Sequence, residues 1–90
     1  MPTKRTLDQI KQREFLKMSE LSELAGVRYS TIKYYGELGL LPYEQKGKRL
    51  AKYYPRIEAT RRLEEILKLR EQGKTVTDII GYFIRKDKES

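Results

Sequence analysis

The chain has 90 residues, which fits one small domain, since domains commonly run about 100–150 residues. Hydrophobic residues make up 38% of it, enough for a small core, whereas the charged fraction of 37% is well above the roughly 25% of an average globular chain. Lys and Arg outnumber Asp and Glu by 20 to 13, a net charge of +7, which favours a polyanionic partner: nucleic acid, or less often an anionic membrane surface.

The chain has neither Cys nor His. Their absence excludes disulfides, Cys-ligated zinc and thiol catalysis, and it removes the usual general base and the commonest metal ligand. We therefore expect no enzyme, no metal and no cofactor. No apolar run approaches the roughly 20 residues that span a bilayer, and none near the start resembles a signal sequence. These features favour a cytoplasmic, nucleoid-associated protein without membrane contact.

The basic charge is concentrated in residues 42–62, which hold seven basic and two acidic residues. A charge run of this kind is often only a solvated surface, so its meaning depends on its neighbours. We expect disorder at Met1–Lys4 and in a flexible tail at 85–90. Residues 1–15 form an N-terminal extension, and residues 16–84 form the domain.

The extension is predicted to contain a short amphipathic helix. Thr6 is a candidate N-cap, and Leu7, Ile10 and Phe15 follow at loose helical spacing.

A second helix is predicted after Ser19, a further N-cap candidate. Leu21, Leu24 and Ala25 form an apolar stripe, and Gly26 can end the helix because glycine adopts the left-handed conformation without steric cost.

A third helix should start at 28–30 and run to about Leu38, with Ile32, Tyr35 and Leu38 on its buried face and Gly39 after its end. Two helices joined by a short turn with glycine are the helix-turn-helix arrangement.

The outer face of this third helix carries Thr31, Lys33 and Tyr34. A hydroxyl, an amine and a phenol are donors suited to phosphate oxygens and base edges. The alternative is a solvated face with an aromatic ring folded onto it.

The polar and basic stretch Tyr43–Tyr54, with Gly47 near its centre, predicts two short strands around a loop, called the wing below. Pro55 suits the first turn of a further helix, because its missing N–H costs nothing there.

That fourth helix should end at Gln72-Gly73, and Thr75–Asp78 has the form of a capping box for a final short helix. The predicted buried positions of the last two helices are Ile57, Leu63, Ile66, Leu67, Ile79, Ile80 and Phe83.

Three segments together resemble the MerR family of winged-helix DNA-binding domains. They are Met18–Val27, Ser30–Tyr35 (Ser-Thr-Ile-Lys-Tyr-Tyr) and Leu38–Pro42 (Leu-Gly-Leu-Leu-Pro). Gly47-Lys48-Arg49, Tyr54-Pro55 and Gln72–Ile79 are similar to later parts of the family pattern in order and spacing.

The resemblance implies a mainly α, MerR-like winged helix-turn-helix with a short two-stranded β wing. It also implies that the third predicted helix enters a DNA major groove and that the wing grips the adjacent backbone. The candidate DNA-binding residues are Arg28, Tyr29, Ser30, Thr31, Lys33, Tyr34, Lys46, Lys48, Arg49 and Lys52.

The chain departs from the family pattern in four places. Arg28 stands where a small N-cap residue is usual, and Gly36 stands where an acidic residue is common. The wing is about two residues longer than usual between Arg49 and Tyr54. After Phe83 comes one apolar residue and no heptad, so no dimerising helix or effector domain is expected.

The expected function is sequence-preferring binding of double-stranded DNA, either in transcriptional regulation or in an excisionase or architectural role. We expect a monomer in free solution and head-to-tail copies on direct repeats, with Thr6–Phe15 either contacting the neighbour or packing on its own core. One alternative is a protein-interaction module that keeps the fold without binding DNA. RNA binding is another, which the scarcity of splayed aromatic residues opposes.

Overall fold

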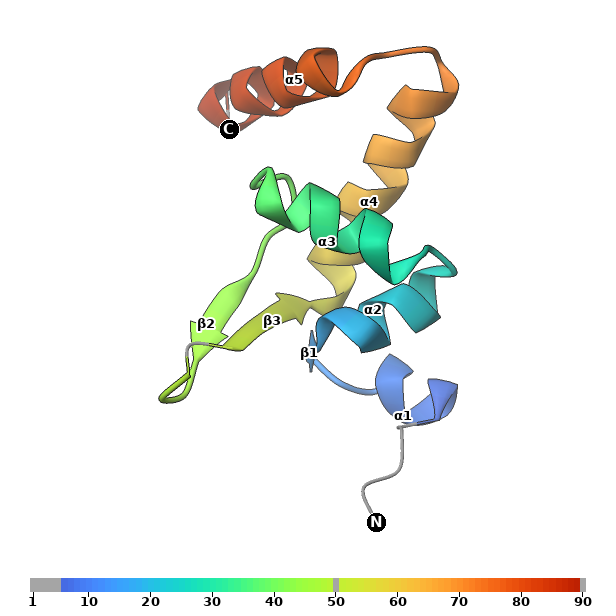
Figure 1. Ribbon diagram of the computed structural model, residues 1–90, viewed down its shortest axis with the longest axis vertical. Helices are drawn as coiled ribbons and strands as arrows, with labels where there is room; N and C mark the ends of the chain where they lie inside the picture. The colour runs from blue at the N-terminus through green and yellow to red at the C-terminus, as the bar shows by residue number, and fades with distance from the viewer. Residues whose placement is uncertain (1–5, 50, 90) are drawn as a thin grey trace.

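A computed structural model describes residues 6–49 and 51–89 of the chain (Figure 1). These residues form five helices and three short strands around one hydrophobic core. The elements are α1 (Leu7–Lys11), β1 (Phe15–Leu16), α2 (Met18–Ala25), α3 (Tyr29–Glu37), β2 (Glu44–Lys46), β3 (Ala51–Pro55), α4 (Arg56–Glu71) and α5 (Val76–Glu89). The predicted mainly α fold with a wing is confirmed. The disorder expected at Met1–Lys4 falls outside the described residues.

Helices α2 and α3 form the predicted helix-turn-helix. Gly26 ends α2 with φ at 68°, a left-handed conformation that glycine adopts without strain. The prediction of Ser19 as N-cap is wrong, since the N-cap is Lys17. Its backbone N–H donates to Oε1 of Glu20 at 2.9 Å, so a side chain three residues later satisfies the free donor.

Helix α3 closely follows the predicted range. Ile32 and Tyr35 are buried as expected, and Gly39 follows the helix with φ at 75°. Leu38, predicted on the same buried face, is 36% exposed, because it caps the helix end rather than continuing its apolar stripe.

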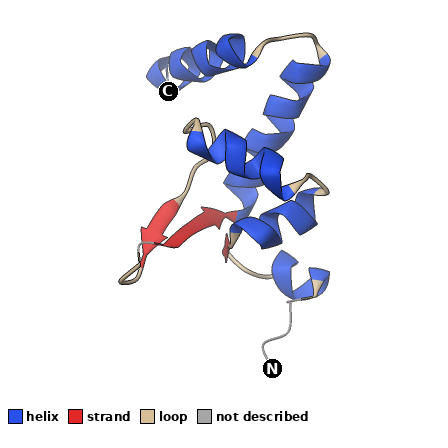
Figure 2. Ribbon diagram, in the orientation of Figure 1, coloured by secondary structure: helices blue, strands red, loops and turns tan. Residues whose placement is uncertain are grey.

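The three strands form one antiparallel sheet in the order β1-β3-β2 (Figure 2). The two-stranded wing is present as β2 and β3, with Gln45 opposite Lys52. The third strand, β1, was not predicted, and Phe15 belongs to it rather than to a helix. Leu16 and Tyr54 are paired and buried, so they define the core side of the sheet; the alternating residues lie on its outer side.

The N-terminal extension contains the predicted helix, which ends at Lys11. The Thr6 hydroxyl accepts a hydrogen bond from the Gln9 N–H at 3.3 Å, and the Gln9 side chain accepts one from the Thr6 N–H at 3.0 Å. Ile10 is fully buried, and Arg56 binds the segment after α1 through its Nε and the Arg13 carbonyl at 2.8 Å. This helix therefore packs on its own core.

Helix α4 joins the sheet to α5 (Figure 1). It buries one narrow face. Leu63 and Ile66 are buried as predicted. Ile57 and Leu67 are 52% and 38% exposed, so their predicted burial is wrong. The buried residues of this 16-residue helix are Ala59, Leu63 and Ile66, and the two exposed residues lie outside that stripe.

Helix α5 starts at the predicted capping box. The Thr75 hydroxyl accepts from the Asp78 N–H, and the Asp78 carboxylate accepts from the Thr75 N–H, both at 3.1 Å. Ile79 and Phe83 are buried as expected, and Ile80 is half-buried.

Helix α5 continues through Glu89, into the segment where the sequence predicted a flexible tail at 85–90. Two contacts with α4 hold these turns: Lys86 with Glu65 at 2.7 Å and Asp87 with Arg62 at 3.3 Å. Arg62 also lies 4.1 Å from the centroid of the Phe83 ring. Polar side chains thus fix a helix end that has few apolar residues.

Candidate nucleic-acid interface

Helix α3 carries an exposed polar and aromatic surface in its first two turns. Tyr29 and Tyr34 are 52% and 47% exposed, and Arg28, Ser30 and Lys33 are exposed as well. Thr31, predicted to face outward, is half-buried. The structure thus brings six predicted contact residues onto one helix and its cap, with donors suited to phosphates and base edges.

Arg28 occupies the N-cap position of α3 and makes no side-chain capping bond there. Its guanidinium is exposed beside the first turn of the helix. The residue that replaces the usual small cap therefore adds a positive charge next to the exposed face of α3.

The wing lysines in the strands are paired within the protein. Lys46 Nζ lies 3.9 Å from the centroid of the Phe15 ring and 3.5 Å from a Glu44 carboxylate oxygen. Lys52 Nζ lies 4.8 Å from the centroid of the Tyr43 ring. Such cation–π contacts hold an ammonium group in place and reduce its freedom to reach a ligand.

The turn of the wing carries two further cations. Lys48 and Arg49 are exposed, and no ion pair of theirs is found within the described part of the chain. Gly47 begins the turn with φ at 82°, a conformation that other residues rarely adopt. These two side chains are the wing cations best placed for an external anion.

Two residues near this surface were not predicted from the sequence. Tyr43 is 42% exposed, and its ring contacts the ammonium group of Lys52. The sequence signal that could have indicated Tyr43 is its position directly after Pro42, at the start of the basic segment. Arg13 lines an open cavity on the outer side of the sheet, and no local pattern indicates that position.

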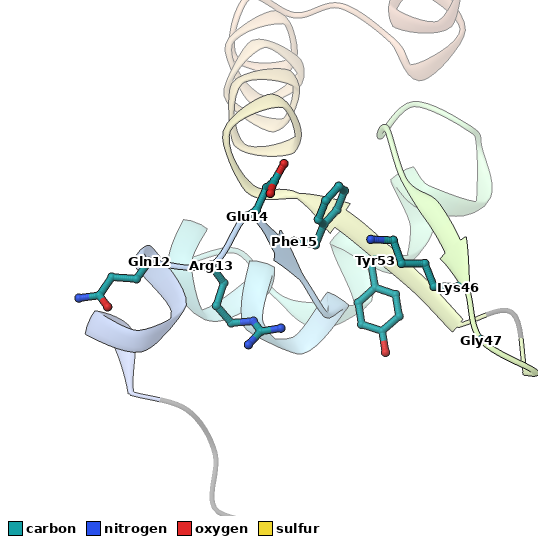
Figure 3. Close-up of a pocket in the computed structure, with 7 residues that line it drawn as sticks. All are labelled: Gln12, Arg13, Glu14, Phe15, Lys46, Gly47 and Tyr53. Carbon is teal, nitrogen blue, oxygen red and sulfur yellow. The ribbon is translucent and has the colours of Figure 1, made fainter.

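The cavity has a volume of about 590 Å³ and lies between the segment before β1 and the wing (Figure 3). Figure 3 shows that Arg13 reaches it from the segment before β1, whereas Lys46 and Tyr53 reach it from β2 and β3. Two cations, Arg13 and Lys46, and one carboxylate, Glu14, are among the charged groups at its lining. Its lining residues are Gln12, Arg13, Glu14, Phe15, Lys46, Gly47 and Tyr53.

Tyr54 connects the wing to the core. Its side chain is fully buried, and no hydrogen-bond partner of its hydroxyl is found among residues 6–49 and 51–89. Burial raises the pKa of Tyr54 above its ordinary value of 10.0, with smaller contributions from Tyr29 and Tyr43. The phenol therefore stays neutral at physiological pH.

The described residues contain no group of three or more His, Cys, Asp or Glu side chains arranged to hold a metal ion. None of the helices in the same residues is long and apolar enough to cross a membrane.

The family model described as MerR HTH family regulatory protein matches residues 16–85. The chain belongs to this family. Comparison with the curated proteins and with the solved structures finds no match. The resemblance noted in the sequence is thereby confirmed, over a span that begins at Leu16 and leaves α1 outside it.

MerR-family helix-turn-helix proteins are DNA-binding regulators rather than enzymes, and membership places this chain among proteins that bind double-stranded DNA. In this chain the MerR-family match covers α2, α3 and the wing, so it includes every predicted contact residue.

Proposed function

We propose that this chain binds double-stranded DNA with sequence preference, inserting α3 into the major groove. The observation that carries the proposal is the exposed face of α3, where Lys33 and Tyr34 are exposed to solvent while Ile32 and Tyr35 are buried. A major groove admits an α-helix and offers a distinct donor and acceptor pattern for each base pair. Base contacts from these side chains would supply the sequence preference.

The wing grips the backbone next to that groove in this proposal. Lys48 and Arg49 at its turn bind phosphates, which position the protein without reading sequence. Lys46 and Lys52 contribute less, because their ammonium groups lie against Phe15 and Tyr43.

Family membership supports a role in transcription, in which occupancy of a site alters access to a promoter. An excisionase or architectural role would use the same contacts, with bending of the DNA as its output. Gel mobility of the complex with the site at different positions along a fragment separates the two roles, because only a bent site makes mobility depend on position.

The proposed assembly is a monomer in solution that binds direct repeats head to tail. The last turns of α5 pack on α4 through Lys86 and Asp87, so this helix end is attached to its own protomer. Ile10 lies in the protein's own core, which leaves Leu7, 46% exposed, as the main apolar residue that α1 can offer a neighbour. Heterologous contacts of this kind need not close and can extend along the duplex.

Light scattering and titration test both parts of the proposal. We expect one protomer in solution at micromolar concentration and cooperative binding to duplexes carrying two or three direct repeats. A stable dimer without DNA, or a preference for inverted repeats, contradicts the assembly. Failure to bind any duplex favours the protein-interaction module instead.

A further inference from the structure

Gly36 occupies a position in α3 where the helix has no backbone need for glycine. It lies inside a regular helix and is not among the residues with positive φ. Glycine is among the poorest helix formers, so its presence in a nine-residue helix calls for a different reason.

The reason is the phenol of Tyr54. A Cβ atom on Gly36 would lie 3.1 Å from Tyr54 Oη, closer than such atoms normally approach. The missing side chain thus leaves a notch in α3, and the hydroxyl end of Tyr54 fills it.

The buried hydroxyl is held there by shape. Buried hydroxyl groups normally have a hydrogen-bond partner, yet within the described residues none is found for this one. Tyr54 also lies in β3, two residues after Lys52 and paired with Leu16 of β1. The same side chain therefore contacts the helix that faces the groove and belongs to the strand that carries the wing.

We propose that Tyr54, seated against Gly36, is a positioning residue that sets the placement of the wing relative to α3. The inference rests on the proposed function and adds to it the element that keeps the two DNA-contacting parts in register. The turn of the wing lies at the far end of the hairpin, several residues before Tyr54 in the sequence. A shift of a few tenths of an ångström at the notch would therefore become a larger displacement at the turn.

Three variants and one control test the proposal. Gly36→Ala places a methyl group against the hydroxyl, Tyr54→Phe removes the hydroxyl, and the double variant replaces the hydroxyl by the methyl group. Gly81→Ala is the matched control, since Gly81 lies in helix α5 and its Cβ would meet only the mobile end of Arg85 at 3.9 Å.

Fluorescence anisotropy on a selected duplex supplies the first measurement. We expect Gly36→Ala to weaken specific binding roughly 3- to 10-fold. It should also lower the log–log salt slope by about 0.9, the loss of one phosphate contact. Tyr54→Phe alone should have a smaller effect, and the double variant should recover both affinity and slope. Gly81→Ala should leave both unchanged.

A second measurement needs no DNA. Because the chain has no Cys, spin labels can be attached at Glu37→Cys in α3 and Lys48→Cys in the wing without further changes. Gly36→Ala should shift or broaden the distance distribution between the labels, and adding Tyr54→Phe should restore it. Gly81→Ala should not change it.

The outcomes separate the two proposals. If the wild-type chain binds no duplex, the proposed function fails, while the label distances still decide whether Tyr54 positions the wing. The positioning role is overturned if Gly36→Ala leaves the label distance unchanged. It is equally overturned if Gly36→Ala alters stability alone, with the salt slope and the specific affinity intact.

Discussion

The ammonium group of Lys46 lies 3.9 Å from the centroid of the Phe15 ring, so a cation–π contact joins the wing strand β2 to the N-terminal strand β1. The two residues lie 31 positions apart in the sequence and on opposite edge strands of the sheet. This contact holds the half-exposed Lys46 against the wing, whereas Lys48 and Arg49 at the turn are exposed and no such contact is found for them within the described residues.

The wing cations should therefore differ in their effect on DNA binding. Lys48→Ala and Arg49→Ala should each lower the log–log salt slope by about 0.9 and weaken binding equally on specific and random duplexes. Lys46→Ala should lower the slope by less, because its charge is held on Phe15.

Salt titrations monitored by anisotropy measure these slopes. Lys68→Ala, which removes an exposed cation on α4, is the control. Equal effects of Lys46→Ala and Arg49→Ala would contradict the division of the wing charges.

The exposed residues of α3 should affect binding without affecting the fold. Lys33→Ala and Tyr34→Ala should each weaken specific binding by roughly 1–3 kcal/mol. The ring of Tyr34 lies 5.7 Å from that of Tyr35, so its loss should also cost a little stability, about 0.5–1.5 kcal/mol.

Tyr35→Ala supplies the contrast, since Tyr35 is buried. It should lower the free energy of unfolding by about 3–5 kcal/mol. Circular dichroism and urea titration measure the stability of all three variants, and unchanged affinity in both Lys33→Ala and Tyr34→Ala would reject the assigned face.

Helix α1 should be part of the folding unit although it lies outside the matched span. Ile10→Ala creates a cavity in the core and should lower the free energy of unfolding by about 2–5 kcal/mol. Leu7→Ala, on the same helix but 46% exposed, should cost less than about 1 kcal/mol. Urea titration compares the two, and equal small losses would show that α1 is not packed on the core.

The attachment of α5 to α4 should weaken in acid. Glu65 accepts hydrogen bonds from the Lys86 ammonium at 2.7 Å and the Tyr82 hydroxyl at 2.8 Å. Burial alone would raise the pKa of Glu65, but these two hydrogen bonds and the nearby cations outweigh it and hold the pKa below its ordinary value of 4.5. A lowered pKa contributes stability that is present above the unfolded value and lost as pH falls through the folded one.

The melting temperature should therefore depend little on pH near neutrality. It should fall below about pH 4.5, where Glu65 becomes protonated and its pairing with Lys86 is lost. Glu65→Gln should flatten that acid limb, whereas Glu64→Gln, an exposed neighbour, should not. The hydrogen bond from the Thr75 backbone also lowers the pKa of Asp78. The stability that Asp78 contributes should therefore be lost over the same acid pH range in the wild type and in both variants. Identical acid limbs in Glu65→Gln and the wild type would contradict the assignment.

The helices could be predicted because their ends depend on local chemistry. Gly26 and Gly39 end α2 and α3, and the Thr75–Asp78 box starts α5, through bonds and backbone angles within a few residues. Tyr35 was assigned to the core and Tyr34 to the surface from helical spacing alone, and both assignments are confirmed.

The rest depends on contacts between residues distant in the sequence. Strand β1 has two residues, too few for an alternating pattern, and exists because β3 pairs with it. The exposure of Ile57 depends on which elements cover α4. Glycine is present at position 36 because the hydroxyl of Tyr54, 18 positions later in the sequence, lies against the helix there. No local sequence rule indicates that contact.

Selection of bound sites from random duplex DNA tests sequence-preferring binding most directly. The wild type and a double variant that combines Lys33→Ala with Tyr34→Ala are carried through the same rounds. We predict that the wild type enriches a defined motif and that the double variant retains salt-dependent binding through Lys48 and Arg49 but loses the motif. Wild-type binding without any enriched sequence, or the same motif from both proteins, would contradict a base-reading role for α3.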